Sequence, residues 1–207
     1  DVTLASLLPE GYVFKSGSTW ISDLSSTELT NVSMAKIPIK SMNYPTEMSM
    51  TYGGAGTLLV NVTKETGTGA ASFQWYKVED GKATVVGSAT TRNQFDLSAL
   101  KLSAGQHTFR FLATCDGYEK MSEDIAVTVQ KANISASLIT PPIAQENLTY
   151  TGQEQALIIA GSVTSGGTMQ YSLTENGTYS QVIPAGTDAG TYTVWYRVIG
   201  DANHNDT

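Results

Sequence analysis

The sequence predicts an all-β fold made of two consecutive β-sandwich domains. Two observations predict it. Short stretches of alternating apolar and polar residues recur along the chain, separated by turns rich in Gly, Ser, Thr, Asn and Asp, and no amphipathic helical segment interrupts them. Three sequence landmarks also occur twice in the same order, which indicates that one structural unit is duplicated.

The duplicated landmarks are a Tyr beside a Gly-containing turn, a Gln followed by an aromatic residue, and an Ala-Gly turn. They pair residues 48–54 with 146–152, 73–75 with 169–171, and 104–108 with 189–193. The spacing between the copies shortens between the Gln-aromatic strand and the Ala-Gly turn. We therefore expect the second copy to lack about one hairpin of the first.

The first copy contains the clearest strand signals. The expected strands lie around residues 58–62, 73–78, 83–88, 94–97, 107–114 and 125–129. The turn Glu79-Asp80-Gly81-Lys82 closes a hairpin, because Asp and Gly both tolerate a positive φ. Phe73 and Trp75 share one strand face, so Trp75 is expected in the core.

The second copy is shorter. Its expected strands are Ala156–Ala160, Thr168–Leu173, Tyr179–Ile183 and Tyr192–Ile199, with Asn176-Gly177 as the turn equivalent to Asp80-Gly81. Many short strands and turns favour immunoglobulin-like sandwiches with Greek-key connections. Tyr192 follows the Ala-Gly turn and is expected to donate a hydrogen bond back to it, as a corner tyrosine does.

These patterns divide the chain into residues 1–42, 43–131 and 132–207. Residues 1–42 are a short mixed extension with a helical turn ending at Pro9, a hairpin of Tyr12–Lys15 with Trp20–Ser22, and a strand at Val32–Ile39. Such a short region cannot form its own core, so it is the end of an upstream domain or an extension packed on the first sandwich.

Composition restricts the expected partners and location. The formal net charge is −7 and the 12 Lys and Arg residues are scattered, which disfavours binding to nucleic acid or an anionic membrane. No apolar run approaches the ~20 residues needed to cross a bilayer, and the chain begins with Asp1, which favours an excised piece of an extracellular protein. The single cysteine, Cys115, aligns with Gly200 in the repeat and is interpreted as an incidental thiol.

Several segments of the second copy resemble a known family. LTYTGQ (148–153), GGTMQY (166–171), GTDAGTY (186–192) and GDANHN (200–205) resemble the MBG-type bacterial Ig-like repeat, found in tandem in cell-surface proteins of Gram-positive, often gut, bacteria. Residues 43–131, marked by FQWYK (73–77), resemble a second bacterial Ig-like type, and LLPEGY (7–12) resembles a segment upstream of such repeats. The resemblance implies a stalk or adhesion role without catalytic residues or cofactors.

Trp195 and Arg197 are the candidate ligand contacts. The alternation within Tyr192–Ile199 places both on the outer face of their strand, and Tyr76 occupies the analogous face of the first copy. An outward Trp stacks on a sugar ring or seats a neighbouring domain, and the alternative is a half-buried side chain under a loop.

Two further kinds of site are weaker alternatives. Asp201, Asn203 and Asn205 alternate like the first calcium ligands of an EF-hand loop, but Asp206 stands where that loop has Gly, so a plain turn is the simpler interpretation. Lys40 or Lys131 are positioned for a Lys–Asn isopeptide bond, with nothing to mark the partner.

No pattern of catalytic residues is present. The two histidines lie in different predicted domains, and motifs for nucleophilic, metal-dependent or phosphate-binding chemistry are missing from the sequence. The leading hypothesis is a monomeric, non-catalytic spacer or stalk on a bacterial surface, with neighbouring domains of a longer chain as its partners. The alternatives are a module that binds a host glycan or surface protein, and an accessory region of a secreted glycan-active enzyme.

Overall fold

The structure is a computed structural model that describes residues 12–14, 34–36, 39–65 and 69–207. These residues form strands and turns, and their only helical segments are the 3-10 turns η3 (Ser98–Leu100) and η4 (Ala136–Leu138). No helix among them is long and apolar enough to cross a membrane. The all-β class predicted from the sequence is confirmed.

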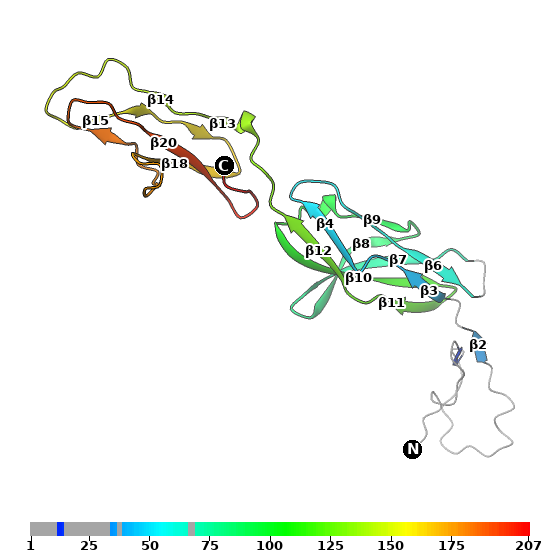
Figure 1. Cartoon of the computed structure of the whole chain (residues 1–207). Helices are drawn as coiled ribbons and strands as arrows, with labels where there is room; N and C mark the ends of the chain where they lie inside the picture. The colour runs from blue at the N-terminus through cyan, green and yellow to red at the C-terminus, as the bar shows by residue number, and fades with distance from the viewer. Residues whose placement is uncertain (1–11, 15–33, 37–38, 66–68) are drawn as a thin grey trace, which may run out of the picture. The chain divides into compact units, whose positions relative to one another are not determined.

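Contacts within the chain group it into two compact units (Figure 1). The first unit consists of residues 1–48, 57–96 and 107–127. The second consists of residues 49–56, 97–106 and 128–207. Each is considered separately below.

The first sandwich is built on one large antiparallel sheet. Its strand order is β4–β12–β10–β7–β8, with β11 also paired to β10. The strands are β4 (Glu47–Thr51), β7 (Ser72–Glu79), β8 (Lys82–Thr90), β10 (Gly105–Cys115), β11 (Tyr118–Met121) and β12 (Ile125–Gln130). β7 and β8 form the predicted hairpin, in which Asp80 and Gly81 have φ values of 49° and 75°.

A second layer of shorter strands completes this sandwich. β3 (Ile39–Asn43) pairs with β6 (Asn61–Lys64), and β5 (Thr57–Leu59) pairs with β9 (Gln94–Asp96). β5 and β6 are one strand interrupted at Val60, whose N–H donates to the carbonyl of Asn93 at 2.8 Å. The alternation predicted for residues 58–62 is therefore correct, with a local break in the ladder.

Aromatic residues fill the space between the two layers. Trp75 of β7 is buried, as predicted, and its ring stacks on Phe95 of β9 with a centroid distance of 4.7 Å. The ring centroid of Phe111 of β10 lies 5.1 Å from that of Trp75 and 5.1 Å from that of Tyr44. Within the first unit, the buried apolar side chains are Ile39, Leu58, Val60, Phe73, Trp75, Phe109, Phe111, Ala113, Cys115, Ile125 and Val127.

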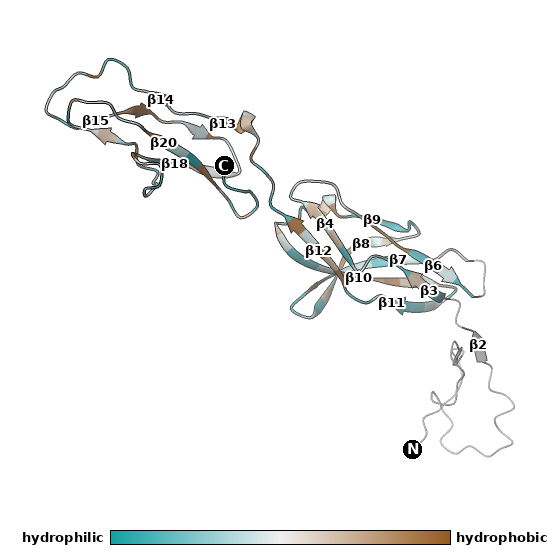
Figure 2. Ribbon diagram, in the orientation of Figure 1, coloured by the Kyte–Doolittle hydropathy of each residue, from teal (hydrophilic) through white to brown (hydrophobic). Residues whose placement is uncertain are grey.

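The second sandwich has shorter ladders and a smaller core. The pairs are β13 (Ile139–Thr140) with β17 (Ser162–Val163), β14 (Ile143–Ala144) with β16 (Ile158–Ile159), β15 (Gln155–Ala156) with β19 (Ala185–Gly186), and β18 (Gly167–Ser172) with β20 (Trp195–Gly200). The buried cluster is Ile134, Ile158, Met169, Tyr171 and Val198. β20 changes from hydrophilic to hydrophobic along its length (Figure 2), so only its second half anchors the core.

The prediction of a strand at Tyr179–Ile183 is wrong. Only Ser180 pairs with β18, through hydrogen bonds of 2.7 and 3.0 Å with the backbone of Tyr171. The Ser180 hydroxyl then accepts the amide of Val182 at 3.3 Å, and this local turn competes with continued pairing.

The strand expected at Ala156–Ala160 is divided into β15 and β16. The N–H of Leu157 donates to the carbonyl of Pro184 at 2.9 Å, so the chain changes partner at this residue. The last strand begins at Trp195 rather than at Tyr192.

The N-terminal extension differs from the prediction in its pairing. β1 (Tyr12–Phe14) is antiparallel to β2 (Met34–Lys36), with Tyr12 opposite Lys36. The partner predicted for this strand, Trp20–Ser22, lies outside the described residues, as does the helical turn before Pro9. The strand predicted at Val32–Ile39 overlaps β2 and the first residue of β3.

Candidate functional site

The outer face of β20 carries the two ligand contacts predicted from the sequence. In the β18–β20 ladder, Ser172 lies opposite Trp195 and Gln170 lies opposite Arg197. The alternate residue Val198 belongs to the buried cluster, so Trp195 and Arg197 face the other way. Trp195 is 38% exposed, which confirms its predicted outward position.

Arg197 is held in a defined orientation on this face. Its guanidinium carbon lies 4.4 Å from the centre of the Tyr179 ring, a cation–π geometry. Its Nε and Nη2 donate to Oε1 of Gln170 at 3.3 and 3.1 Å, and the Tyr179 hydroxyl donates to the carbonyl of Glu175 at 2.9 Å. The ion pairs of the described residues do not include Arg197. The groups that orient its guanidinium, Tyr179 and Gln170, are both neutral.

The sequence did not reveal that Gln170 and Tyr179 belong to this arrangement. Gln170 lies in a predicted strand, but the register that places it opposite Arg197 is not visible in the alternation. Tyr179 was assigned to a strand that does not form, whereas its ring lies beneath Arg197. We call Trp195, Arg197, Tyr179 and Gln170 the β20 outer face.

Tyr76, the third predicted contact, lies on a different surface. It is half-buried on β7, opposite Arg110 of β10 and Val85 of β8. Arg110 forms a hydrogen-bonded ion pair with Asp124. The hydrogen bond, followed by the negative charge of Asp124, raises the pKa of Arg110 above its ordinary value. The cation beside Tyr76 is therefore already neutralised, unlike Arg197.

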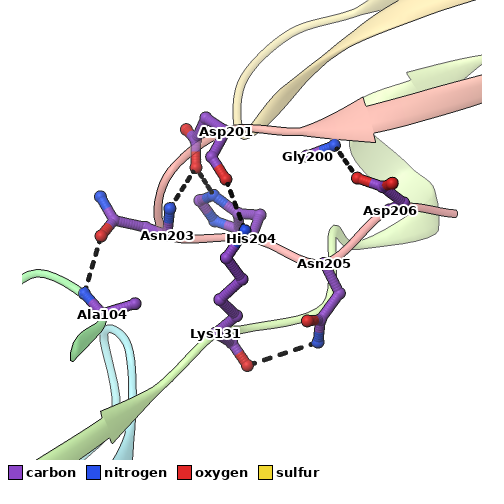
Figure 3. A network of polar contacts seen from close by, with 8 residues as sticks. All are labelled: Ala104, Lys131, Gly200, Asp201, Asn203, His204, Asn205 and Asp206. Atoms are coloured by element: carbon purple, nitrogen blue, oxygen red, sulfur yellow. Dashed lines mark hydrogen bonds and ion pairs between the residues drawn. The ribbon is translucent and has the colours of Figure 1, made fainter.

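The turn after β20 contains the residues that resemble the start of a calcium loop (Figure 3). Oδ1 of Asp201 accepts the N–H of Asn203 at 2.8 Å and lies 2.7 Å from Nδ1 of His204. The hydrogen bond with His204, followed by that with the Asn203 backbone, lowers the pKa of Asp201 below its ordinary value. Asp206 Oδ1 accepts the N–H of Gly200 at 2.8 Å.

Other side chains of this turn reach neighbouring segments of the second unit (Figure 3). Oδ1 of Asn203 accepts the N–H of Ala104 at 2.8 Å. Nδ2 of Asn205 donates to Oδ1 of Asn133 at 2.9 Å and lies 3.5 Å from the carbonyl of Lys131, whose own ammonium donates to the carbonyl of Asp201 at 3.2 Å. These groups do not converge on one point, and among the described residues no three His, Cys, Asp or Glu side chains gather as metal ligands.

The remaining candidates have structural surroundings. Cys115 is buried and burial raises the pKa of its thiol, so the reactive thiolate is disfavoured. The ammonium of Lys40 lies 3.3 Å from a carboxylate oxygen of Glu65. Tyr192 donates its hydroxyl to the carbonyl of Asp188 at 2.9 Å, which confirms the predicted corner tyrosine.

Comparison with solved structures finds similarity to bacterial fibronectin(III)-like modules. Fibronectin(III)-like modules of CbhA from Clostridium thermocellum match with 12% sequence identity and a TM-score of 0.34, over 79% of this chain and 88% of that chain. No protein-family model matches the sequence, and no curated protein does.

Proposed function

We propose that the chain is a non-catalytic structural module, a spacer or stalk of tandem Ig-like sandwiches that displays another domain from a bacterial cell surface. The sandwiches correspond to residues 43–131 and 132–207, and the second is an MBG-type repeat. The observation that carries the proposal is the polar network around residues 201–206. Its ligand-capable side chains are bonded to Ala104, Lys131, Asn133 and Gly200, which all belong to the compact unit of residues 49–56, 97–106 and 128–207.

Such a network suits a module that transmits force. Hydrogen bonds from side chains to the backbone of other segments must break together before those segments separate. A spacer depends on this resistance, whereas a ligand-binding loop keeps its donors and acceptors free. The small number of charged residues, 15% of the chain, also leaves few groups for acid–base chemistry.

Single-molecule stretching of the whole chain tests this role. The proposal predicts discrete unfolding events, each releasing about 3.3–3.6 Å per residue of a sandwich. The double variant Asn203→Ala/Asn205→Ala should lower the unfolding force of the second unit. Asn176→Ala, at an exposed asparagine of the second unit outside the network, is the matched control. Extension without discrete events, or equal forces for the double variant and the control, would contradict the proposal.

The β20 outer face supports a second function, binding of an acidic glycan. Arg197 is the one Lys or Arg among residues 132–207, and it lies on the same strand face as the exposed Trp195. Stacking on Tyr179 and hydrogen bonds to Gln170 restrict its guanidinium before any ligand arrives, which reduces the entropy lost on binding. A Trp ring beside an oriented cation suits a sugar ring that carries a carboxylate or sulfate.

A glycan array with matched acidic and neutral sugars tests this function. Trp195→Ala and Arg197→Ala should each weaken binding at least about tenfold, the equivalent of 1.4 kcal/mol. Arg197→Ala should affect acidic sugars selectively. Tyr150→Ala removes another exposed aromatic side chain of the same sandwich and should bind like the wild type. Absence of wild-type binding, or equal binding by all variants, would exclude this site.

A further inference from the structure

Gln170 and Arg197 meet because of the register between β18 and β20. They lie directly opposite each other in this antiparallel ladder, on the outer face of the second sandwich. The β7–β10 ladder of the first sandwich places Gln74 opposite Leu112 in the corresponding register. The same strand position therefore holds a glutamine in both sandwiches, but its partner is apolar in the first and cationic in the second.

The two glutamines use opposite ends of their amide groups. Nε2 of Gln74 donates to the carbonyls of Trp75 and Gly87, each at 3.2 Å. Oε1 of Gln170 instead accepts hydrogen bonds from Nε and Nη2 of Arg197. A guanidinium has donors and no acceptor, so the oxygen of the Gln170 amide must be the atom that faces it. This oxygen is thus committed to orienting Arg197.

The bonds to Gln170 occupy one edge of the Arg197 guanidinium. They use the N–H of Nε and one N–H of Nη2, and among the described residues Gln170 is the acceptor for both. Arg197 is exposed, and its other end carries one donor on Nη1 and a parallel one on Nη2. Such a pair of parallel donors binds both oxygens of a carboxylate at once.

The Tyr179 ring covers one flat face of the same guanidinium. The guanidinium carbon lies 4.4 Å from the centre of the ring. The Tyr179 hydroxyl donates to the carbonyl of Glu175 at 2.9 Å, which fixes the ring from its far end. With one edge and one face occupied, the Nη1–Nη2 end is the side from which an anion reaches Arg197.

The loop that contains Glu175 is packed tightly against β18. The N–H of Thr174 donates to the Ser172 hydroxyl at 3.2 Å, and the N–H of Gly177 donates to the Thr174 carbonyl at 3.2 Å. A Cβ at Gly177 would collide with the Thr174 hydroxyl, so the loop closes in this way because residue 177 has no side chain. Ser172 lies opposite Trp195, so the loop is anchored beside the exposed Trp ring.

We infer, building on the glycan-binding function proposed above, that Gln170 is the specificity-determining residue of the β20 outer face and reserves the free end of Arg197 for one carboxylate of an acidic sugar. Its neutral amide fixes the guanidinium and leaves the positive charge to the ligand. Trp195 lies two residues away on the same face, about 7 Å along the strand, and supplies the surface on which the sugar ring stacks.

The charge of residue 170 therefore sets the preference for acidic sugars. A carboxylate at this position would accept the same hydrogen bonds from Arg197, because it has the same shape and the same acceptor geometry as the amide. It would also neutralise the guanidinium, as Asp124 does for Arg110 in the first sandwich. The sugar carboxylate would then meet a neutral pair, whereas stacking on Trp195 would be unaffected.

Replacing Gln170 by its charged isostere tests this role. The whole chain is titrated with methyl glucuronide and with methyl glucoside, whose essential difference is the carboxylate, and amide NMR spectra report both binding and the fold of the variant. We expect the wild type to prefer the glucuronide. Gln170→Glu should weaken glucuronide binding at least about tenfold and leave glucoside binding unchanged.

Two further variants accompany this measurement. Gln153→Glu adds the same charge at an exposed glutamine of the second unit outside the β20 outer face, and it should bind both sugars like the wild type. Arg197→Gln removes the charge from the other side of the pair, so it should lose the preference for glucuronide in the same way as Gln170→Glu.

The possible outcomes separate this role of Gln170 from glycan binding itself. A glucuronide preference that survives in Gln170→Glu, an equal loss in Gln153→Glu, or a wild type that binds both sugars equally would overturn the role of Gln170 and leave a glycan-binding site in place. A wild type that binds neither sugar would overturn both. The spacer role is independent of these results, because it depends on the unfolding force.

Discussion

The two sandwiches bury equivalent central strands to different extents. In β10, Phe109, Phe111 and Ala113 are all 0% exposed, whereas the aligned inner face of β20 is closed only at Val198. Both strands have the same alternation and both pair with the preceding Gln-aromatic strand. Among the described residues, the difference is the second neighbour, because β12 covers β10 whereas only the pair of Val198 with Thr207 flanks β20. Alternation therefore specifies which face turns inward, and the neighbouring strand determines whether that face is buried.

The largest expected contrast comes from truncating the aligned aromatic residues. Phe111→Ala should destabilise the first sandwich by about 3–5 kcal/mol, because it removes a buried ring that contacts Trp75 and Tyr44. Tyr196→Ala should destabilise the second sandwich by less than about 1 kcal/mol, since its ring is half exposed. Amide NMR through a urea titration reports each sandwich separately. Similar losses of stability in both sandwiches would contradict the expectation that the difference in burial determines the cost of truncation.

A smaller effect is expected at the corner of the second sandwich. Tyr192→Phe removes the hydrogen bond to the Asp188 carbonyl and should destabilise this sandwich by about 0.5–1.5 kcal/mol. Tyr150→Phe is the matched control, because the Tyr150 side chain is largely exposed, and it should leave the unfolding free energy unchanged. A loss as large for Tyr150→Phe would mean that the hydroxyl bond to Asp188 contributes nothing specific.

The smallest effect concerns the turn that positions Thr207. The pKa of Asp201 is lower in the folded chain than its ordinary value of about 3.9, so its contribution to stability is present above that value. The contribution is lost as the pH falls through the lowered folded pKa. The amide signal of Asn203 should shift over this acidic range, and Asp201→Asn should abolish that titration. A shift that persists in Asp201→Asn would assign it to another carboxyl group.

Local patterns predicted the residues whose role depends on their own neighbours in sequence. The turn at Asp80-Gly81 required positive φ values, the buried Trp75 followed from strand alternation, and Tyr192 followed from its distance to the Ala-Gly turn. These signals concern a few adjacent residues and are independent of sheet register.

Features that depend on pairing between distant segments were missed. The strand predicted at Tyr179–Ile183 contains residues that favour β-structure, but the Ser180 hydroxyl accepts a hydrogen bond from the nearby Val182 amide and the ladder ends there. The contact of Arg197 with Gln170 depends on register, and its contact with Tyr179 depends on that failed strand. The predicted ligand contacts Trp195 and Arg197 lie on one face of β20, but whether they bind a ligand is a chemical property that alternation alone does not supply.

The burial of Cys115 makes the opening of the first sandwich measurable by thiol labelling. The thiol is enclosed next to the Gly69 carbonyl, 3.8 Å from its sulfur, and is the one cysteine of the sequence. A thiol reagent will therefore modify the native chain only when this part of the first sandwich opens. At a reagent concentration at which labelling outpaces reclosing, the labelling time measures the lifetime of the closed state, with no introduced probe and no contribution from the second sandwich, whose residues include no cysteine.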